Sequence, residues 1–243
     1  MSRSGGSLRT LRELKGKAKL RYILDYYKLP LILAGLLLYA AVWFAMRSLN
    51  QKENILFVGL INAVPSEEMM TALSDGYLDA MEYPESDFAV YLYRNLFLTA
   101  DEASEYHAYS YASRMKILGA IDAQRLDIVL MNQEAFDAFS QNGYLEDLAG
   151  LIPGASGQYR ELYDRIADSL QKNIYIREDN ATDILLGTAD EYWSVSSEGF
   201  FGLDLSAVSP LIQKEELTGN VYLGIIANSP RKEEALRYLE YLT

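Results

Sequence analysis

The chain has 243 residues, of which half are hydrophobic, and it contains no cysteine and a single histidine. A disulfide framework, a thiolate nucleophile and a cysteine-based zinc site are therefore excluded, and one main domain is expected at this length. The formal charge is −12, but residues 1–28 carry +6, so the rest of the chain carries −18. Because so acidic a body repels a phosphate backbone, nucleic-acid binding is not expected.

Residues 29–46 form an uncharged segment of eighteen residues, LPLILAGLLLYAAVWFAM, between Lys28 and Arg47. At about 1.5 Å per residue, a helix of this length spans roughly 27 Å, close to the hydrocarbon thickness of a bilayer. Aromatic residues such as Trp43 near the ends of such a segment are typical of membrane interfaces. The sequence thus predicts a single transmembrane helix at 29–46, in contact with the lipid bilayer.

A cleaved signal peptide is the alternative for this segment. Signal peptides have an apolar core of about 7 to 15 residues behind a short basic stretch, and that pattern differs from the long basic region found here. The positive charges before the segment place the N-terminus in the cytoplasm; they either only set this topology or also form a docking element. We expect a single-pass protein of the cell membrane, with a cytoplasmic tail (1–28), the transmembrane helix, a connector (47–53) and an extracellular domain (54–243).

Short apolar runs alternate with helical patterns after residue 54. Buried strands are expected at 55–62, 88–93, 127–131 and 221–227. Helices are expected from 65, from 99 to 118, from 132 to 142, from 159 to 170 and from 229 onward, with only short helices and turns between 172 and 219. This order predicts an α/β fold with a mostly parallel sheet and helices on both faces.

Helix ends and faces are predicted from local signals. Thr99 and Glu102 match a capping box, Asn132 is a cap, and Ser229 before Pro230 marks the start of the last helix. The Asn142-Gly143 pair is a left-handed stop signal. The buried face of helix 99–118 is expected to hold Ala108, Tyr111, Ala112, Met115 and Leu118.

Two stretches resemble the extracellular solute-binding proteins of ABC importers, namely DIVLMNQEAFDAFSQNGYLEDL (127–148) and VYLGIIANSPRKEEALRYLEYL (221–242). The connector FFGLDLSAVSPLIQ (200–213) and the YYKLP sequence at 26–30 are similar to small membrane-anchored members from Gram-positive bacteria. The resemblance implies one lobe of a periplasmic-binding-protein-like type II fold, with ABC permease subunits as partners and a small solute or sugar as ligand. The chain is shorter than the family norm where the second lobe belongs, so it resembles a truncated member with a shallow or absent cleft.

No catalytic constellation is recognised. The serines lack a Gly-x-Ser-x-Gly elbow, no glycine-rich phosphate loop follows a strand, and His107 has no second histidine or cysteine beside it. A structural or surface role is expected for His107. We therefore expect no enzyme, no cofactor and no metal site.

Five residues are candidates for ligand binding. Asn62, Asn132 and Gln133 follow the first and third strands, at the carboxyl edge of the sheet where ligands bind in such folds. Tyr192 and Trp193 have flat faces that could stack on a sugar ring. The alternatives are that Asn132 is only a helix cap and that Tyr192 and Trp193 are buried against the sheet.

The leading hypothesis is a membrane-anchored, solute-binding-like protein that serves an ABC importer as a ligand-binding or accessory component. The alternative is a surface interaction or scaffold protein with a degenerate binding lobe.

Overall fold

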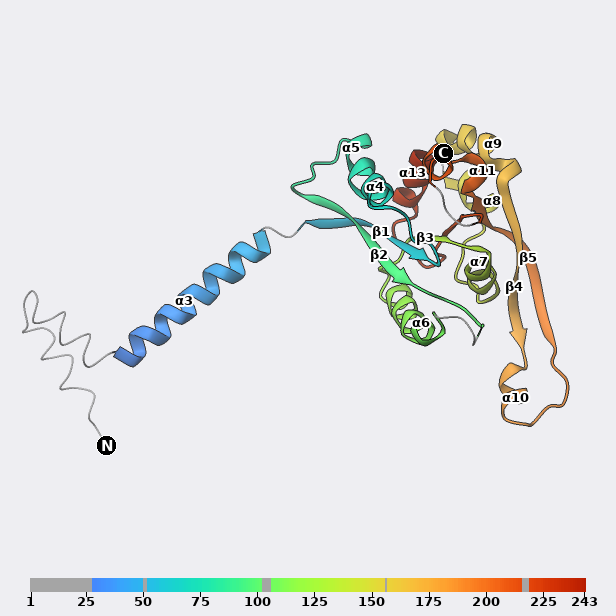
Figure 1. Ribbon diagram of the computed structural model, residues 1–243, viewed down its shortest axis with the longest axis horizontal. Coiled ribbons are helices and arrows are strands. Elements are labelled where there is room, and N and C mark those ends of the chain that lie inside the picture. The colour runs from blue at the N-terminus through green and yellow to red at the C-terminus, as the bar shows by residue number, and fades with distance from the viewer. Residues whose placement is uncertain (1–27, 50–51, 102–105, 156, 216–218) are drawn as a thin grey trace, which may run out of the picture. The chain divides into compact units, whose positions relative to one another are not determined.

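The computed structural model describes residues 28–49, 52–101, 106–155, 157–215 and 219–243 (Figure 1). Most of the basic tail lies outside the described residues, as does Glu102 of the predicted capping box. The chain divides into a unit that ends at Gln51 and a compact unit, Lys52–Thr243, with its own core.

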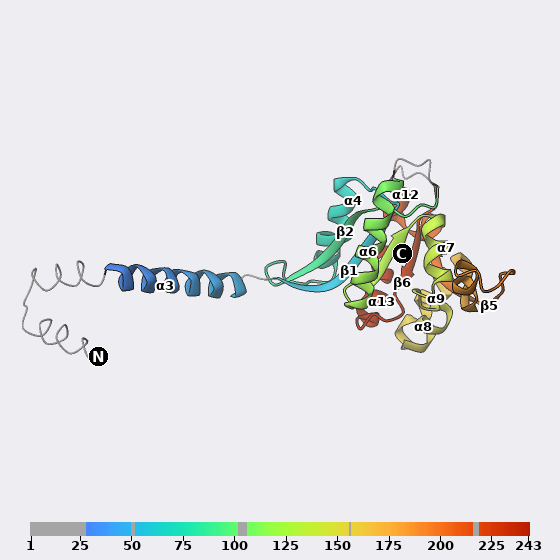
Figure 2. The same cartoon turned by 90° about the horizontal axis from the view of Figure 1, so that it is seen from below.

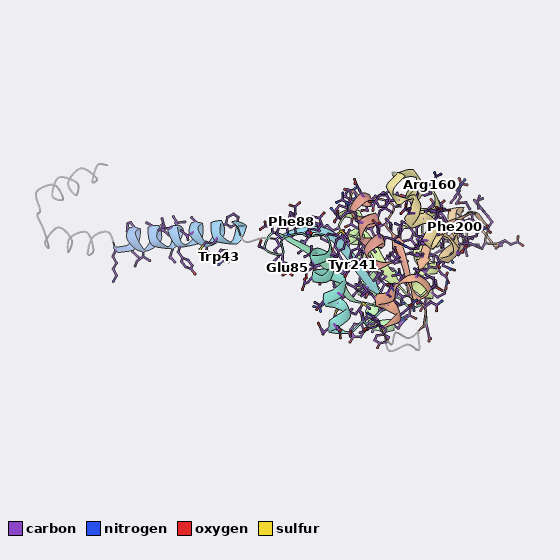
Figure 3. The ribbon with its side chains drawn as sticks, turned by 90° about the horizontal axis from the view of Figure 1, so that it is seen from above. Trp43, Glu85, Phe88, Arg160, Phe200 and Tyr241 are labelled. Atoms are coloured by element: carbon purple, nitrogen blue, oxygen red, sulfur yellow. The ribbon has the colours of Figure 1, made fainter. Side chains whose placement is uncertain are left out.

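The described part of the first unit is a single helix, α3 (Lys28–Leu49), of 22 residues. Those of its side chains that are described, including Trp43, are exposed (Figure 3). The side chains of Leu31 and Ala45, inside the uncharged segment, are not among them. Within the described residues, no helix is both long enough and apolar enough to cross a membrane.

The second unit is built on a six-stranded mixed sheet in the order β2-β1-β3-β6-β5-β4. The strands are β1 (Glu53–Ile61), β2 (Phe88–Leu96), β3 (Ile128–Met131), β4 (Leu170–Asp179), β5 (Ser194–Asp204) and β6 (Tyr222–Ile225). The first strand pairs in parallel with β2 and β3, whereas the other three pairings are antiparallel. The α/β class is thus confirmed, but the expected parallel arrangement holds only for β2, β1 and β3.

Helices cover both faces of this sheet, as expected. One face carries α4 (Glu67–Thr71), the π-helix η1 (Ala72–Gly76), α5 (Tyr77–Ala80), α8 (Leu148–Ala155), α9 (Arg160–Ile166) and α13 (Lys232–Leu242). The other face carries α6 (His107–Asp122) and α7 (Gln133–Gln141), which Figure 2 shows in front of the strands. Short helical turns complete the chain: η2 (Gly157–Tyr159), η3 (Ala167–Ser169), α10 (Ala181–Leu185), α11 (Leu205–Val208) and α12 (Pro210–Gln213).

The region from 172 to 219, for which only short helices and turns were expected, contains most of a long β-hairpin. Strands β4 and β5 pair from Leu170 opposite Leu203 to Asp179 opposite Ser194, with α10 at the far end (Figure 1). Most residues of β4 are exposed or half-buried because this strand lies at the edge of the sheet. Such a strand needs no continuous apolar run, so its sequence lacks the signal that marks buried strands.

The predicted buried face of α6 is wrong. Tyr111 and Met115 are 75% and 53% exposed, and the buried face carries Ser110, Ser113, Ile117, Ala120 and Ile121. The two serines are buried because their hydroxyl groups accept hydrogen bonds from backbone N–H groups in the segment that follows β2. Ser113 Oγ accepts from Phe97 N at 3.0 Å, and Ser110 Oγ accepts from Thr99 N at 3.2 Å.

Other helix ends agree only partly with the expectations. The stop after α7 is confirmed, since Gly143 has a φ of +70°. The helix expected from 159 to 170 ends at Ile166, and Leu170 already belongs to β4. The last helix begins at Lys232 and not at Pro230, and the Ser229 hydroxyl both donates to Asp127 Oδ1 and accepts from Arg231 N at 3.0 Å. His107 is exposed at the start of α6.

Tyrosines of α13 clamp the π-helix against the domain. The hydroxyl of Tyr238 donates to the carbonyl of Leu73 at 2.7 Å, and that of Tyr241 donates to the carbonyl of Ala72 at 2.9 Å. Burial raises the pKa of both tyrosines, so their hydroxyl groups stay protonated and act as donors. A Cβ at Gly76 would lie 2.9 Å from the Tyr241 hydroxyl, which explains the glycine at this point.

A buried carboxylate, Asp127, joins three parts of the domain at the amino end of β3. Its side chain is fully buried and accepts hydrogen bonds from Phe57 N at 2.9 Å and from the Ser229 hydroxyl at 2.6 Å. Arg231 Nε forms an ion pair with it at 2.9 Å, and the guanidinium group lies over the Phe57 ring at 4.8 Å. The carboxylate therefore fixes β1, β3 and the turn before α13 together.

We predict that Asp127→Ala lowers the free energy of unfolding of residues 52–243 by about 3–5 kcal/mol, because it leaves buried donors unpaired. Urea denaturation of the purified fragment measures this change. The control is Glu233→Gln, which removes an exposed ion pair with Arg237 and should cost about 0.5 kcal/mol or less. Equal effects of the two substitutions would contradict the central role of Asp127.

Candidate functional site

Asn62 and Asn132 lie together at the carboxyl edge of the parallel strands. Asn62 Nδ2 donates to Asn132 Oδ1 at 3.0 Å and to the carbonyl of Leu98 at 2.7 Å. Asn62 Oδ1 accepts from Leu98 N at 2.8 Å. The ends of β1 and β3 and the segment after β2 are thereby joined through two amide side chains.

The hydrogen bonds of these amide groups are made within the protein and stabilise the fold. Asn62 uses both hydrogens of its amide and its oxygen within the cluster, and its backbone is left-handed, with a φ of +53°. Asn132 Oδ1 also accepts from Ala135 N at 3.0 Å, so Asn132 is the cap of α7. The alternative interpretation of Asn132 as a helix cap is confirmed.

Gln133 lies beside this cluster but on the exposed side of α7. Its Nε2 donates to Asp137 Oδ1 at 2.8 Å, and the same oxygen accepts from Asn173 Nδ2 at 2.8 Å. Gln133 therefore supports an acidic residue that ties α7 to β4. Asp137 is the better candidate for a ligand contact, because it lines a cavity.

Tyr192 and Trp193 are placed elsewhere by the structure. They lie in the loop that enters β5, at the far end of the hairpin, and are 54% and 51% exposed. The expectation that they pack against the sheet is wrong, because the hairpin extends beyond the domain body (Figure 1). The five sequence-predicted residues thus divide between the carboxyl edge and the hairpin.

A cavity of about 360 Å³ lies next to the carboxyl edge, between α6 and α7. These two helices lie side by side on one face of the sheet (Figure 2). The apolar lining of the cavity comes from Leu98, Ala100, Ile117, Leu118, Ala138, Phe139 and Tyr144. The polar lining of the cavity comes from Thr99, Arg114, Glu134, Asp137, Gln141 and Asn142. The volume is in the range of small-molecule sites.

The polar groups of this cavity can bind an uncharged polar solute. Glu134 Oε1 accepts from Ala100 N at 2.9 Å, which orients the carboxylate. Asp137 is likewise held in place by its amide donors, and Arg114 adds donors from α6. Carboxylate acceptors and guanidinium donors over an apolar floor suit hydroxyl groups on a small ring. The described residues include no group of three or more His, Cys, Asp or Glu side chains that could hold a metal ion.

Arg114, Glu134, Asp137 and Tyr144 were not identified as site residues from the sequence. A signal was present for two of them: Glu134 and Asp137 are three residues apart, on the helix that starts directly after β3. Residues three apart on a helix share a face. Arg114 could not be found in this way, because its position depends on which face of α6 is buried.

We predict unequal effects on stability from two substitutions that change an amide to a carboxylate. Asn62→Asp places an acceptor against the Leu98 carbonyl and Asn132 Oδ1, so the free energy of unfolding should fall by about 2 kcal/mol or more. Asn132→Asp keeps the acceptor that Asn62 and Ala135 use, and aspartate is a good helix cap, so a change within about 0.5 kcal/mol is expected. Urea denaturation measures both, and a tolerated Asn62→Asp would overturn the assigned donor role.

Comparisons with known proteins identify no relative of this chain. No family model matches it, and neither a curated protein nor a solved structure matches it. The resemblance to solute-binding proteins therefore stays a prediction that rests on sequence motifs. The cavity and the hairpin are two surfaces of the described residues from which a function can be inferred.

Proposed function

We propose that this chain is a membrane-anchored, non-enzymatic, solute-binding-like protein that serves an ABC importer as a ligand-binding or accessory component. The observation that carries this proposal is the cavity between α6 and α7, beside the carboxyl ends of β2 and β3. In sheets with parallel strands, ligands bind beyond the carboxyl ends of the strands. The motifs at 127–148 and 221–242 support the link to importers.

A small polyhydroxylated solute, such as a sugar, is the ligand class that suits this cavity. Glu134 and Asp137 offer acceptors for hydroxyl hydrogens, and Arg114 offers donors for hydroxyl oxygens. Tyr144 adds part of an aromatic ring to the lining. The resemblance to solute-binding proteins favours the same class.

Capture by one lobe should be weak. Solute-binding proteins have two lobes that close over a ligand, whereas the described residues of this chain form one sheet with a hairpin at 170–204. A ligand held by one lobe keeps part of its surface in water and gains fewer contacts. We expect dissociation constants between about 1 μM and 1 mM.

Thermal unfolding of residues 52–243 with a panel of mono- and disaccharides tests ligand binding. A solute present at ten times its Kd should stabilise the fold by about 1.4 kcal/mol and raise Tm by about 3–5 °C. Ala138→Phe should fill the cavity and abolish the rise, whereas Ala112→Phe, on the exposed face of α6, should leave it intact. If no solute raises Tm, or if Ala138→Phe retains the rise, the proposed ligand site is wrong.

The membrane anchor is proposed from the complete sequence of residues 29–46. All eighteen residues are uncharged, and two of them, Leu31 and Ala45, have side chains outside the described set. The α-helical backbone of α3 satisfies its own hydrogen bonds, as a bilayer requires. The excess of positive charge before the segment favours a cytoplasmic N-terminus.

Protease added to intact cells tests this topology. We predict that residues 54–243 are degraded, while an epitope tag at the N-terminus is protected until the membrane is permeabilised. A tag inserted after Thr243 serves as the control and should be lost from intact cells. Protection of the acidic domain in intact cells would exclude the extracellular assignment.

A surface interaction or scaffold role is the second candidate function. The observation that favours it is the far end of the β4–β5 hairpin, where exposed large apolar side chains do not belong to the cavity lining. Exposed apolar patches on a folded protein commonly mark interaction sites. This role does not depend on a bound solute.

A further inference from the structure

The far end of the β4–β5 hairpin, called here the hairpin tip (residues 180–195), exposes several large apolar side chains. The exposed fractions are 86% for Leu185, 70% for Leu186, 54% for Tyr192, 51% for Trp193 and 49% for Val195. Covering such side chains removes apolar surface from water, which favours association with a partner. Tyrosine and tryptophan are also enriched at the energetic centres of protein interfaces.

The hairpin tip is held in a defined conformation by Asn180. This residue is 4% exposed, and its Nδ2 donates to the carbonyl of Glu191 at 2.8 Å. Its Oδ1 accepts from Trp193 N at 2.8 Å, and its backbone N–H donates to the Trp193 carbonyl. One buried amide therefore fixes the backbone that carries Tyr192 and Trp193.

Backbone hydrogen bonds also hold the helical part of the hairpin tip, α10, at its carboxyl end. Gly187 has a φ of +68° and donates to Ile184, while Thr188 N donates to the Asp183 carbonyl. This pair of hydrogen bonds forms a Schellman-type end for α10. It positions Leu185 and Leu186 before binding, so little conformational entropy is lost when a partner covers them.

Charges around the hairpin tip select among possible partners. Residues 177–195 contain five acidic residues against one basic residue. An anionic lipid surface would be repelled, and a second copy of the same tip would be repelled as well. A surface that combines an apolar groove with lysine or arginine on its rim complements both features.

We propose that the hairpin tip docks into an apolar groove with a cationic rim on another protein. This inference deepens the second candidate function and does not use the solute cavity. Leu185, Leu186 and Trp193 would enter the groove, and Asp183, Asp190 and Glu191 would face the cationic rim. The fixed backbone around Asn180 would present these groups together.

Photo-crosslinking in cells that express the full chain tests the proposal. A photoreactive amino acid at Leu186 should crosslink one protein, whereas the same group at the exposed Tyr111 of α6 should not. The crosslinked protein is then purified, and its affinity for the full chain is measured. Crosslinks from Leu186 only to lipid, only to a second copy of the chain, or to nothing would overturn the proposal.

Four comparisons test the stated chemistry with the purified partner. Leu186→Ser and the pair Asp183→Lys with Asp190→Lys should each weaken binding at least tenfold, and added salt should weaken it further. Alanine in place of the partner's lysine or arginine residues at the crosslink should weaken it similarly. Unchanged affinity in variants with an unaltered Tm would refute the proposal, while the sugar-induced Tm rise of the same variants reports separately on the solute cavity.

Discussion

The arrangement of the sheet depends on the hydrogen bonds and the ion pair that the buried carboxylate of Asp127 makes. A charge without contact with water persists only with a partner and with hydrogen bonds, and Asp127 has Arg231, Ser229 and the backbone of Phe57. These partners come from the turn after β6 and from β1. The turn after the antiparallel β6 is therefore tied to the middle of β1 and to the amino end of β3.

A second polar cluster closes the opposite end of the same strands. Asn62 and Asn132 join the carboxyl ends of β1 and β3 to the segment after β2. With both ends fixed, the helices α6 and α7 are carried at a defined separation, and the cavity lies between them. The amides of Asn62 and Asn132, which the sequence suggested as ligand contacts, thus hold the strand ends together. The charged side chains of α6 and α7 line the cavity instead.

The hairpin gives the domain a second surface with different chemistry. The cavity is a concave site with mixed charges, whereas the hairpin tip is a convex, apolar and acidic surface. The described residues form one sheet, and no second lobe among them covers the cavity. The proposed partner binds at the hairpin tip and the proposed solute binds in the cavity, so accessory and binding roles are compatible in one chain.

The sequence by itself determined the α/β class, the buried strands β1, β3 and β6, and the cap at Asn132, because continuous apolar runs and local capping act over a few residues. Tertiary structure alone decided the antiparallel half of the sheet, the buried face of α6 and the exposure of Trp193. An edge hairpin buries too little to leave an apolar pattern, and the serines of α6 are buried to satisfy backbone groups after β2. Such pairings join residues distant in the chain, so no local pattern records them.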